Sequence, residues 1–293
     1  MLNTKQDIAS LLLYYLRFSG IRNFILKQRR VAVARFLAFH DVLPEERNTL
    51  ENNLRFLKYN TNVISLDDFF SNHMCVNKIN TVITFDDGYK GWIDNALPIL
   101  KSLNLPATFF VPSGFVGLKK SDEQTFIKKN IFVKLPPRKI TGGLTLANLS
   151  TLVAEGFTIG GHTLNHCSLD SINNASELRQ EITEDKHRLE EMTGLKIDYF
   201  SYPTGVHTNA QVNLIDELIA AGYKGAVTVD AGFNSTSTNR YLLHRDIIDA
   251  WMSVPIFKAR VFGNIDGVRA LKRWGGLTSS IFVKKGGKYD GQC

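Results

Sequence analysis

Residues 81–111 read TVITFDDGYKGWIDNALPILKSLNLPATFFV, and this stretch decides the fold. An apolar run at residues 81–85 ends at two aspartates, Asp86 and Asp87. A helical spacing of apolar residues then leads to a second apolar run at residues 107–111. Short continuous apolar runs are typical of buried parallel strands, and a helix between two of them gives a βαβ unit. We therefore expect both aspartates at the carboxyl end of a buried strand.

The same alternation continues on both sides of this unit. Further strands are predicted at residues 31–39, 63–66, 157–160, 199–202, 225–228 and 241–243, and further helices at residues 45–57, 146–154, 175–192 and 210–221. Residues 117–143 are charged and contain two prolines and several glycines, so they are predicted to form a loop-like insertion or mobile flap. Repeated alternation with short connections predicts an α/β protein with a mostly parallel, barrel-like sheet.

Composition and charge narrow the class of protein. With 44% hydrophobic and 22% charged residues, the 293-residue chain is neither disordered nor collagen-like. The net charge of +7 is unevenly distributed, because residues 1–35 and 255–293 are each strongly basic whereas residues 36–254 have a net charge of about −5. An acidic middle argues against a nucleic-acid enzyme, whose cleft would be lined with Lys and Arg.

The charge pattern divides the chain into a basic amphipathic N-terminal segment, one catalytic domain and a basic C-terminal extension, at residues 1–35, 36–254 and 255–293. The apolar residues 8–16 are too few to span a bilayer, which needs about 20 residues, and they do not match a secretory signal. An amphipathic helix is predicted there, either packed on the domain or lying on an anionic membrane surface. Trp274 and Phe282 are the candidate membrane contacts of the C-terminal extension, with core packing as the alternative.

Polar residues that could carry chemistry follow several predicted strands. The carboxyl ends of barrel strands meet at one rim, so these residues are expected to lie together. His162 and His166 form an HxxxH pattern, in which residues four apart share a face and can bind one cation. A carboxylate from Asp86 or Asp87 would complete a three-ligand site with open positions. Because successive side chains diverge, one aspartate would bind the cation and the other would accept a proton.

These residues resemble the signatures of the polysaccharide deacetylase family. Residues 84–88 (TFDDG) with 107–111 (ATFFV) are similar to its first signature, residues 162–166 (HTLNH) to its second and residues 200–205 (FSYPTG) to its third. The resemblance covers roughly residues 36–250 and implies a distorted (β/α) barrel of about seven strands. It also implies a metal-dependent amidohydrolase that removes an N-acetyl group from an amino sugar in a polysaccharide or glycan precursor.

The resemblance further implies roles for individual residues. Asp87, His162 and His166 would hold a divalent cation, expected to be zinc, and Asp86 would be the general base. The cation would polarise the acetamide carbonyl and lower the pKa of a bound water towards about 7. The backbone N–H of Thr204 would stabilise the oxyanion.

The leaving amine needs a general acid with a pKa near neutrality, for which histidine is suited. A circularly permuted form of the family carries this histidine after a strand at the front of the domain. Residues 36–41 (FLAFHD) resemble that strand, so His40 is the expected acid. His244 is its rival because residues 242–246 (LLHRD) imitate the same signature, and a structural role is the alternative for His244.

The third signature departs from the family pattern at two positions. Many members have an arginine where this chain has Ser201 and a tyrosine where it has Thr204. Arg245 would supply the missing charge if its guanidinium lay within about 6 Å of the general base, because it would keep that carboxylate ionised and oriented. Tyr202 and Pro203 are predicted to contact the substrate, with burial in the core as the alternative for Tyr202.

A second hypothesis is a catalytically silent carbohydrate-binding relative, which the altered third signature favours and the intact metal and base residues oppose. A metal phosphohydrolase would need more ligands for a two-metal site than the sequence offers. The expected partner is an N-acetylated carbohydrate rather than a nucleic acid. We expect a cytoplasmic protein whose substrate is presented at the inner face of the membrane. The sequence leaves the particular amino sugar and the oligomeric state open.

Overall fold

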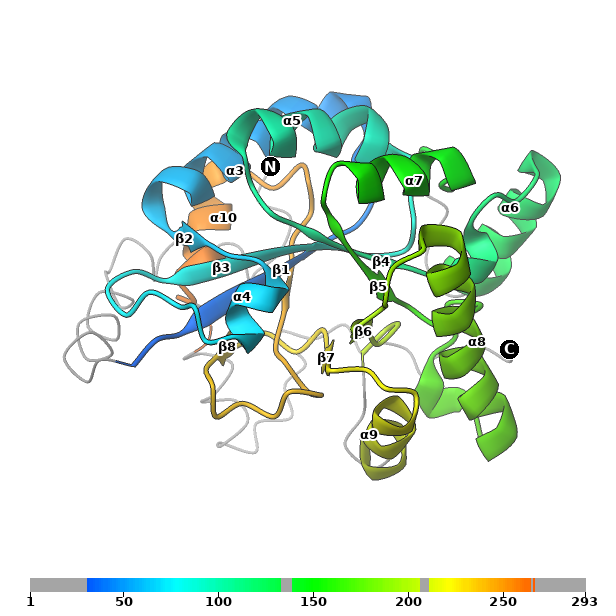
Figure 1. Cartoon of the computed structure of the whole chain (residues 1–293). Coiled ribbons are helices and arrows are strands. Elements are labelled where there is room, and N and C mark those ends of the chain that lie inside the picture. Colours follow the sequence, from blue (N-terminus) through cyan, green and yellow to red (C-terminus); the bar gives the residue numbers. More distant parts are fainter. Residues whose placement is uncertain (1–30, 133–138, 206–210, 265, 267–293) are drawn as a thin grey trace, which may run out of the picture.

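The computed structural model describes residues 31–132, 139–205, 211–264 and 266. In this part of the chain a curled, mostly parallel sheet is covered on its outer side by helices (Figure 1). Strands and helices alternate along the chain as the sequence predicts. The arrangement is a distorted (β/α) barrel, which confirms the predicted fold class.

The strands found in the described residues are β1 (Ala34–Phe39), β2 (Asn62–Val63), β3 (Asn80–Phe85), β4 (Thr108–Val111), β5 (Thr158–Gly161), β6 (Tyr199–Ser201), β7 (Gly225–Val227), β8 (Phe233–Asn234) and β9 (Asp246–Ile247). Their order is β7-β6-β5-β4-β3-β1-β8, with β2 beside β3 and β9 beside β1. Strands β1 and β3 pair in parallel over their whole length, with Phe39 opposite Phe85. His40 and Asp86 therefore leave the sheet side by side.

The segment after β8 brings the two sides of the sheet together. Leu243 forms a parallel bridge with Val227 of β7, and β9 pairs in parallel with β1 through Asp246 and Leu37. This segment thus contacts both ends of the path that runs from β7 to β1. The contacts curl the sheet into a barrel and bring residue 245 to the rim.

Of the strand predicted at residues 241–243, only a single parallel bridge forms, between Leu243 and Val227 of β7. Asn239 Oδ1 accepts a hydrogen bond from Tyr241 N, and Asn239 O accepts one from Leu242 N, each at 2.9 Å. These bonds make a turn, because an asparagine side chain competes with a sheet for the backbone two residues ahead. Regular strand pairing begins only at Asp246.

The α-helices of the described residues are α3 (Arg47–Asn60), α4 (Leu66–Phe70), α5 (Leu97–Leu103), α6 (Lys120–Phe126), α7 (Leu146–Ala154), α8 (Ala175–Thr193), α9 (Gln211–Ala220) and α10 (Val254–Val261). Helix α7 has the predicted bounds because Thr145 caps it by accepting a hydrogen bond from Asn148 N. Helix α4 was not predicted. Ser65 caps it in the same way through Asp68 N, which shortens the strand predicted at residues 63–66.

The prediction of a loop-like insertion at residues 117–143 is wrong for its first half. Helix α6 continues there into a π-helical turn, Ile127–Ile131. Phe126 and Ile127 are buried, and the Phe126 ring stacks on Phe115 with 4.8 Å between centroids. The helix forms because this apolar face packs on the barrel, whereas the prolines and glycines that led to the loop prediction come later in the segment.

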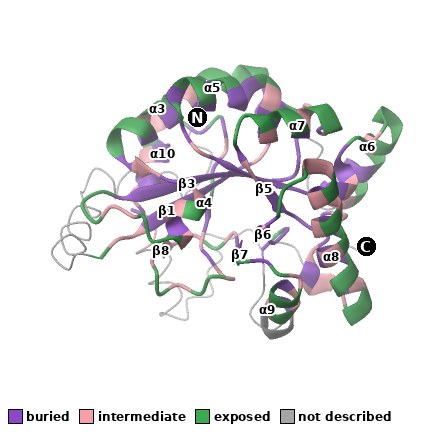
Figure 2. Ribbon diagram, in the orientation of Figure 1, coloured by how far each residue is buried: buried purple, intermediate pink, exposed green. Residues whose placement is uncertain are grey.

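The central strands are rigidly packed beneath the rim. Every residue of β1 and β3 is buried (Figure 2). The Phe85 ring stacks on Phe39 at 5.3 Å and on Phe109 at 5.0 Å between centroids. Burial of one such side chain stabilises a fold by about 1.5–3 kcal/mol. These contacts hold the strand end that carries Asp86 and Asp87.

The described parts of both basic ends pack on the barrel. Arg35 of β1 donates a 2.8 Å hydrogen bond to Asp266 and forms an ion pair with Asp246. Phe257 of α10 is fully buried and meets Phe56 of α3 edge to face. In these regions the ends therefore contribute to the core of the barrel.

The other sequence predictions for the ends stay predictions. The N-terminal amphipathic helix, Trp274 and Phe282 lie outside the described residues. The domain boundaries at residues 35 and 254 are not tested either. Among the described helices, none combines the length and the apolar character that crossing a bilayer requires.

Candidate metal centre and active site

A cavity of about 310 Å³ opens at the carboxyl ends of the barrel strands. Its wall contains seven of the residues that the sequence predicted for the site: His40, Asp86, Asp87, His162, His166, Tyr202 and Thr204. Pro203, Arg245 and the rival histidine His244 are not part of the wall. These residues follow four different strands, β1, β3, β5 and β6, so four strand ends meet in one cavity, as a barrel rim requires.

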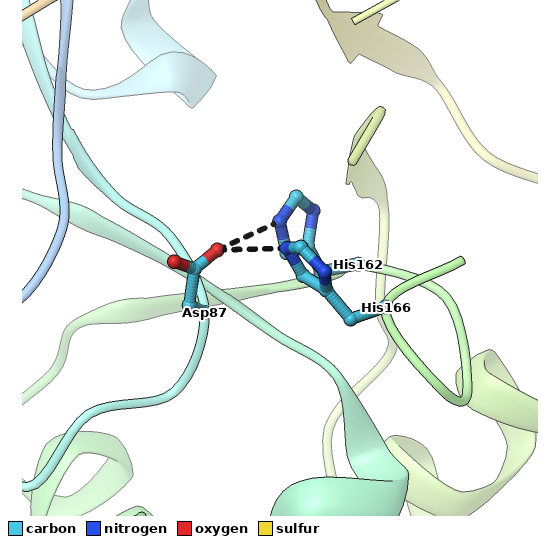
Figure 3. A group of neighbouring side chains, drawn as sticks. All are labelled: Asp87, His162 and His166. Carbon is cyan, nitrogen blue, oxygen red and sulfur yellow. Dashed lines mark hydrogen bonds and ion pairs between the residues drawn. The ribbon is translucent and has the colours of Figure 1, made fainter. Parts of the chain in front are cut away.

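Asp87, His162 and His166 all line this cavity and form a tight group (Figure 3). Asp87 Oδ1 lies 3.3 Å from His162 Nε2 and 3.0 Å from His166 Nε2. One ligand atom from each residue lies within 4.8 Å of the other two, and all three residues are buried. Two imidazole nitrogens and one carboxylate oxygen are a common ligand set for a catalytic divalent cation.

The second ring nitrogen of each histidine fixes the orientation of the first. Nδ1 of His162 lies 2.7 Å from the carbonyl oxygen of Ser201, and Nδ1 of His166 lies 3.0 Å from that of Asn130. A carbonyl oxygen only accepts, so both Nδ1 atoms donate their hydrogen. Nε2 of each ring therefore faces Asp87, where it donates a hydrogen to the carboxylate while protonated and offers a lone pair to a cation once neutral.

Asp87 has an unusual backbone conformation and an acidic carboxyl group. Its φ of +83° lies in the region that favours glycine, and such strain is often found at functional sites. Burial would raise the pKa of Asp87, but the charge of His166 and the hydrogen bonds of both imidazoles hold it well below the usual value. Asp87 is therefore ionised at neutral pH.

Asp86 pairs with Arg245. The fully buried guanidinium donates to Asp86 Oδ1 at 2.7 Å and to Asp86 Oδ2 at 2.6 Å. It also donates to Thr84 Oγ1, Ser201 Oγ and the Thr228 carbonyl at 3.0, 2.7 and 2.8 Å. These bonds use all five N–H groups of an arginine. The predicted contact between Arg245 and the carboxylate is present.

This contact controls the charge of Asp86. Burial would raise the pKa of Asp86, but the charge of Arg245, followed by that of His162, lowers it overall. Ser201 stands where the family pattern has an arginine, and its hydroxyl joins the pair by donating to Asp86 at 3.1 Å. The small serine leaves room for the guanidinium that arrives from the start of β9.

The two candidate acids have different surroundings. His40 lines the cavity, and its carbonyl accepts a 2.9 Å hydrogen bond from Trp92 Nε1, which fixes the backbone at the end of β1. His244 packs its ring over Gly232, and its Nδ1 is buried without a hydrogen-bond partner. Only His40 is therefore in a position to reach a substrate in the cavity.

The third signature contributes to the cavity through two of its residues. Thr204 is exposed at the rim with a φ of +60°. Tyr202 is buried, lines the cavity and donates from its hydroxyl to the Tyr241 carbonyl at 3.0 Å. Tyr202 is therefore a core tyrosine whose side chain also lines the cavity, while its contact with a substrate stays a prediction.

Two residues that support the loop with both histidines, Asp185 and Glu181, were not predicted from the sequence. Asp185 of α8 accepts hydrogen bonds from the backbone N–H groups of His162 and Ser113, each at 2.8 Å. Burial raises the pKa of Asp185 to about 7. Glu181, one turn earlier, binds Asn165. Two acidic residues four apart on the buried face of a helix were the available signal.

Known proteins resemble this chain in sequence and in fold. A family model for polysaccharide deacetylases matches residues 73–226. A Bacillus subtilis (strain 168) protein named "Putative polysaccharide deacetylase YxkH" is 25% identical over 180 residues, which are 61% of this chain and 55% of that protein. The chain therefore spans about half the length of this relative.

Solved structures share the fold at low sequence identity. IcaB from Ammonifex degensii has a TM-score of 0.62 and 22% identity, covering 78% of this chain and 97% of that one. The Streptococcus pyogenes deacetylase PplD, solved in complex with acetate, has a TM-score of 0.61 and 20% identity, covering 79% of this chain and 99% of that one. The family match covers more than half of the 293 residues. By fold and by sequence, this chain belongs to the polysaccharide deacetylase family.

Proposed function

We propose that this chain is a metal-dependent hydrolase that removes the N-acetyl group from an amino sugar in a polysaccharide or glycan precursor. The observation that carries the proposal is the convergence of ligand atoms from Asp87, His162 and His166 within 4.8 Å, in the same cavity as Asp86 and His40. Nitrogen and carboxylate ligands in this combination fit a divalent cation, and zinc is the one we expect.

When bound, such a cation polarises the acetamide carbonyl and makes a water molecule more acidic. Asp86, which Arg245 keeps ionised, accepts a proton from the attacking water. The water oxygen bonds to the carbonyl carbon, and the backbone N–H of Thr204 stabilises the oxyanion. His40 gives a proton to the amine nitrogen as the C–N bond breaks. The products are acetate and a free amino sugar.

The proposed roles of His40 and Tyr202 depend on which side chains line the cavity. We assign the acid role to His40 rather than to His244 because only His40 lines the cavity. Tyr202 offers a ring to the sugar, while substrate contact by Pro203 stays a prediction. The silent carbohydrate-binding alternative loses part of its support, because Arg245 supplies the charge that the third signature lacks at Ser201. The departure at Thr204 still favours that alternative.

Acetate release from N-acetylglucosamine oligomers and from a lipid-linked N-acetylamino sugar tests the proposal. We expect the zinc-loaded protein to release acetate from at least one of these, and we expect EDTA to abolish the release and added zinc to restore it. Release that survives EDTA, or that is unchanged in His162→Ala, would contradict the proposal.

A further inference from the structure

Helix α8 presents two buried carboxylates to the loop that carries both histidines. The helix packs beside β5 (Figure 1), and Glu181 and Asp185 lie one turn apart on it. Glu181 is 5% exposed and Asp185 is fully buried. Within the part of the chain that the structure describes, neither carboxylate has a salt bridge to Lys, Arg or His. Buried acids without a cationic partner are costly, so they call for an explanation.

Both carboxylates bind the ligand loop through hydrogen bonds. Asp185 Oδ2 accepts from the backbone N–H of His162 at 2.8 Å. Glu181 accepts from Asn165 twice, from its backbone N–H at 2.9 Å and from its side-chain amide at 2.7 Å. The Glu181 carbonyl also accepts from Leu164 N at 3.0 Å. Three of the five residues from His162 to His166 are therefore bound to one turn of α8.

The chemistry of these bonds requires carboxylates. Asp185 Oδ1 accepts from Ser113 N at 2.8 Å, so both of its oxygens face backbone donors. Both oxygens of Glu181 likewise face donors of Asn165. An asparagine at residue 185 would turn an NH₂ group towards one of its two backbone donors, which leaves that donor unsatisfied. A glutamine at residue 181 should cost less, because the Asn165 side-chain amide can rotate to accept from the new NH₂ group.

The ligand loop needs such a restraint because its backbone is strained. Thr163 has a φ of +60° and His166 a φ of +58°, and neither is a glycine. Residues in this conformation persist only when their surroundings hold them. The hydrogen bonds from α8 lie on both sides of Thr163, and they keep His162 and His166 directed at Asp87.

We propose that Glu181 and Asp185 are positioning residues of the metal site, which pre-form the ligand loop and so raise its affinity for a divalent cation. The inference rests on the proposed function, because it assumes that Asp87, His162 and His166 bind a cation. Residues that orient metal ligands typically contribute about 10- to 100-fold in affinity.

Zinc affinity of the full chain, measured by competition with a chromophoric chelator, tests the inference without any measurement of activity. We expect Asp185→Asn to weaken zinc binding by about 10- to 100-fold and Glu181→Gln to weaken it less. Glu190→Gln is the matched control. Glu190 lies on the same helix and accepts from Ile197 N through one oxygen, far from the ligand loop. We expect its zinc affinity to be unchanged.

Two further measurements separate positioning from general stability. Leu189→Ala removes a fully buried side chain from α8, so it should lower the melting temperature while leaving zinc affinity unchanged. The absorption spectrum of the cobalt-substituted protein should change in Asp185→Asn and not in Leu189→Ala. If Asp185→Asn fails to fold, Glu181→Gln decides the question against Glu190→Gln.

The outcomes distinguish this inference from the proposed function. A wild-type chain that binds no zinc or cobalt overturns both. A wild-type chain that binds zinc, with equal affinity in Asp185→Asn, Glu181→Gln and Glu190→Gln, overturns only the positioning role.

Discussion

Asp86 and Asp87 are adjacent, identical and buried, and yet they belong to two different regions of the cavity. On the Asp87 side two imidazoles present ring nitrogens to one carboxylate oxygen. On the Asp86 side a fully buried guanidinium donates to both carboxylate oxygens. In the proposed function the first region holds a cation and the second holds a charged base. Partners from distant parts of the chain, not residue type, set this difference.

The backbone separates the two regions. Successive side chains at a strand end point in different directions, and Asp87 has in addition a left-handed φ of +83°. Each aspartate therefore meets its own set of neighbours. The difference between Asp86 and Asp87 can be tested by substituting the partners of one aspartate while the partners of the other are kept.

Loss of a ligand on the Asp87 side should have the largest effect. His162→Ala removes one of the three proposed ligand atoms. We therefore expect loss of bound zinc and a fall in the rate of acetate release of at least about 10³-fold. Zinc content by mass spectrometry and initial rates of acetate release measure both. The exposed His187 on α8 provides the control. A His187→Ala variant that loses as much zinc would show that the effect is not specific to the site.

Removal of the proposed acid should have the next largest effect. His40→Ala should reduce the rate of acetate release by about 10²- to 10⁴-fold, because the leaving amine then departs without a positioned proton donor. Zinc binding should persist. His244→Ala should retain most of the activity because His244 does not line the cavity. Equal losses in the two variants would argue against the assignment to His40.

Disruption of the Asp86 side should affect stability as well as rate. Arg245→Met leaves a buried carboxylate without its partner, so we expect about 3–5 kcal/mol of destabilisation in urea unfolding. The pKa of Asp86 should rise, because burial then acts without the opposing charge. Arg245→Lys keeps the charge but cannot make both hydrogen bonds, and it should recover only part of the activity. Full activity in Arg245→Met would refute the pairing as a functional one.

The smallest effect is expected at Tyr202. Tyr202→Phe removes the 3.0 Å hydrogen bond to the Tyr241 carbonyl and keeps the ring that lines the cavity. Loss of one such bond should cost about 1 kcal/mol of stability. The KM for the sugar should stay within a few-fold of the wild-type value, whereas Tyr202→Ala should raise it. Thermal unfolding and steady-state kinetics separate the two contributions.

The strand ends and the ligand group could be predicted from the sequence because short motifs carry them. The apolar runs place Asp86 and His162 at strand ends. His162 and His166 do meet, but through a loop with left-handed residues at Thr163 and His166 rather than on the shared helical face that the HxxxH spacing suggests. The pairing of Arg245 with the base could be predicted only as a replacement for a charge that the third signature lacks.

The supporting residues could not be predicted because their partners are backbone groups far away in sequence. Nothing local shows that the Asn130 carbonyl binds His166, or that Asp185 binds the His162 amide. The strand predicted at 241–243 is reduced to one bridge, and the loop predicted at 117–143 is wrong in its first half, for related reasons. The Asn239 side chain forms a turn by accepting from Tyr241 N, and this turn replaces most of the predicted strand. Burial of Phe126 against Phe115 stabilises a helix where a loop was predicted.

The most direct test of the division between Asp86 and Asp87 measures zinc content and acetate release in parallel for Asp86→Asn and Asp87→Asn. We predict that Asp86→Asn retains bound zinc but releases acetate at least about 10²-fold more slowly, because it lacks the base. We predict that Asp87→Asn loses the zinc and the activity together. Retention of zinc in both variants, or loss of zinc in both, would contradict the account.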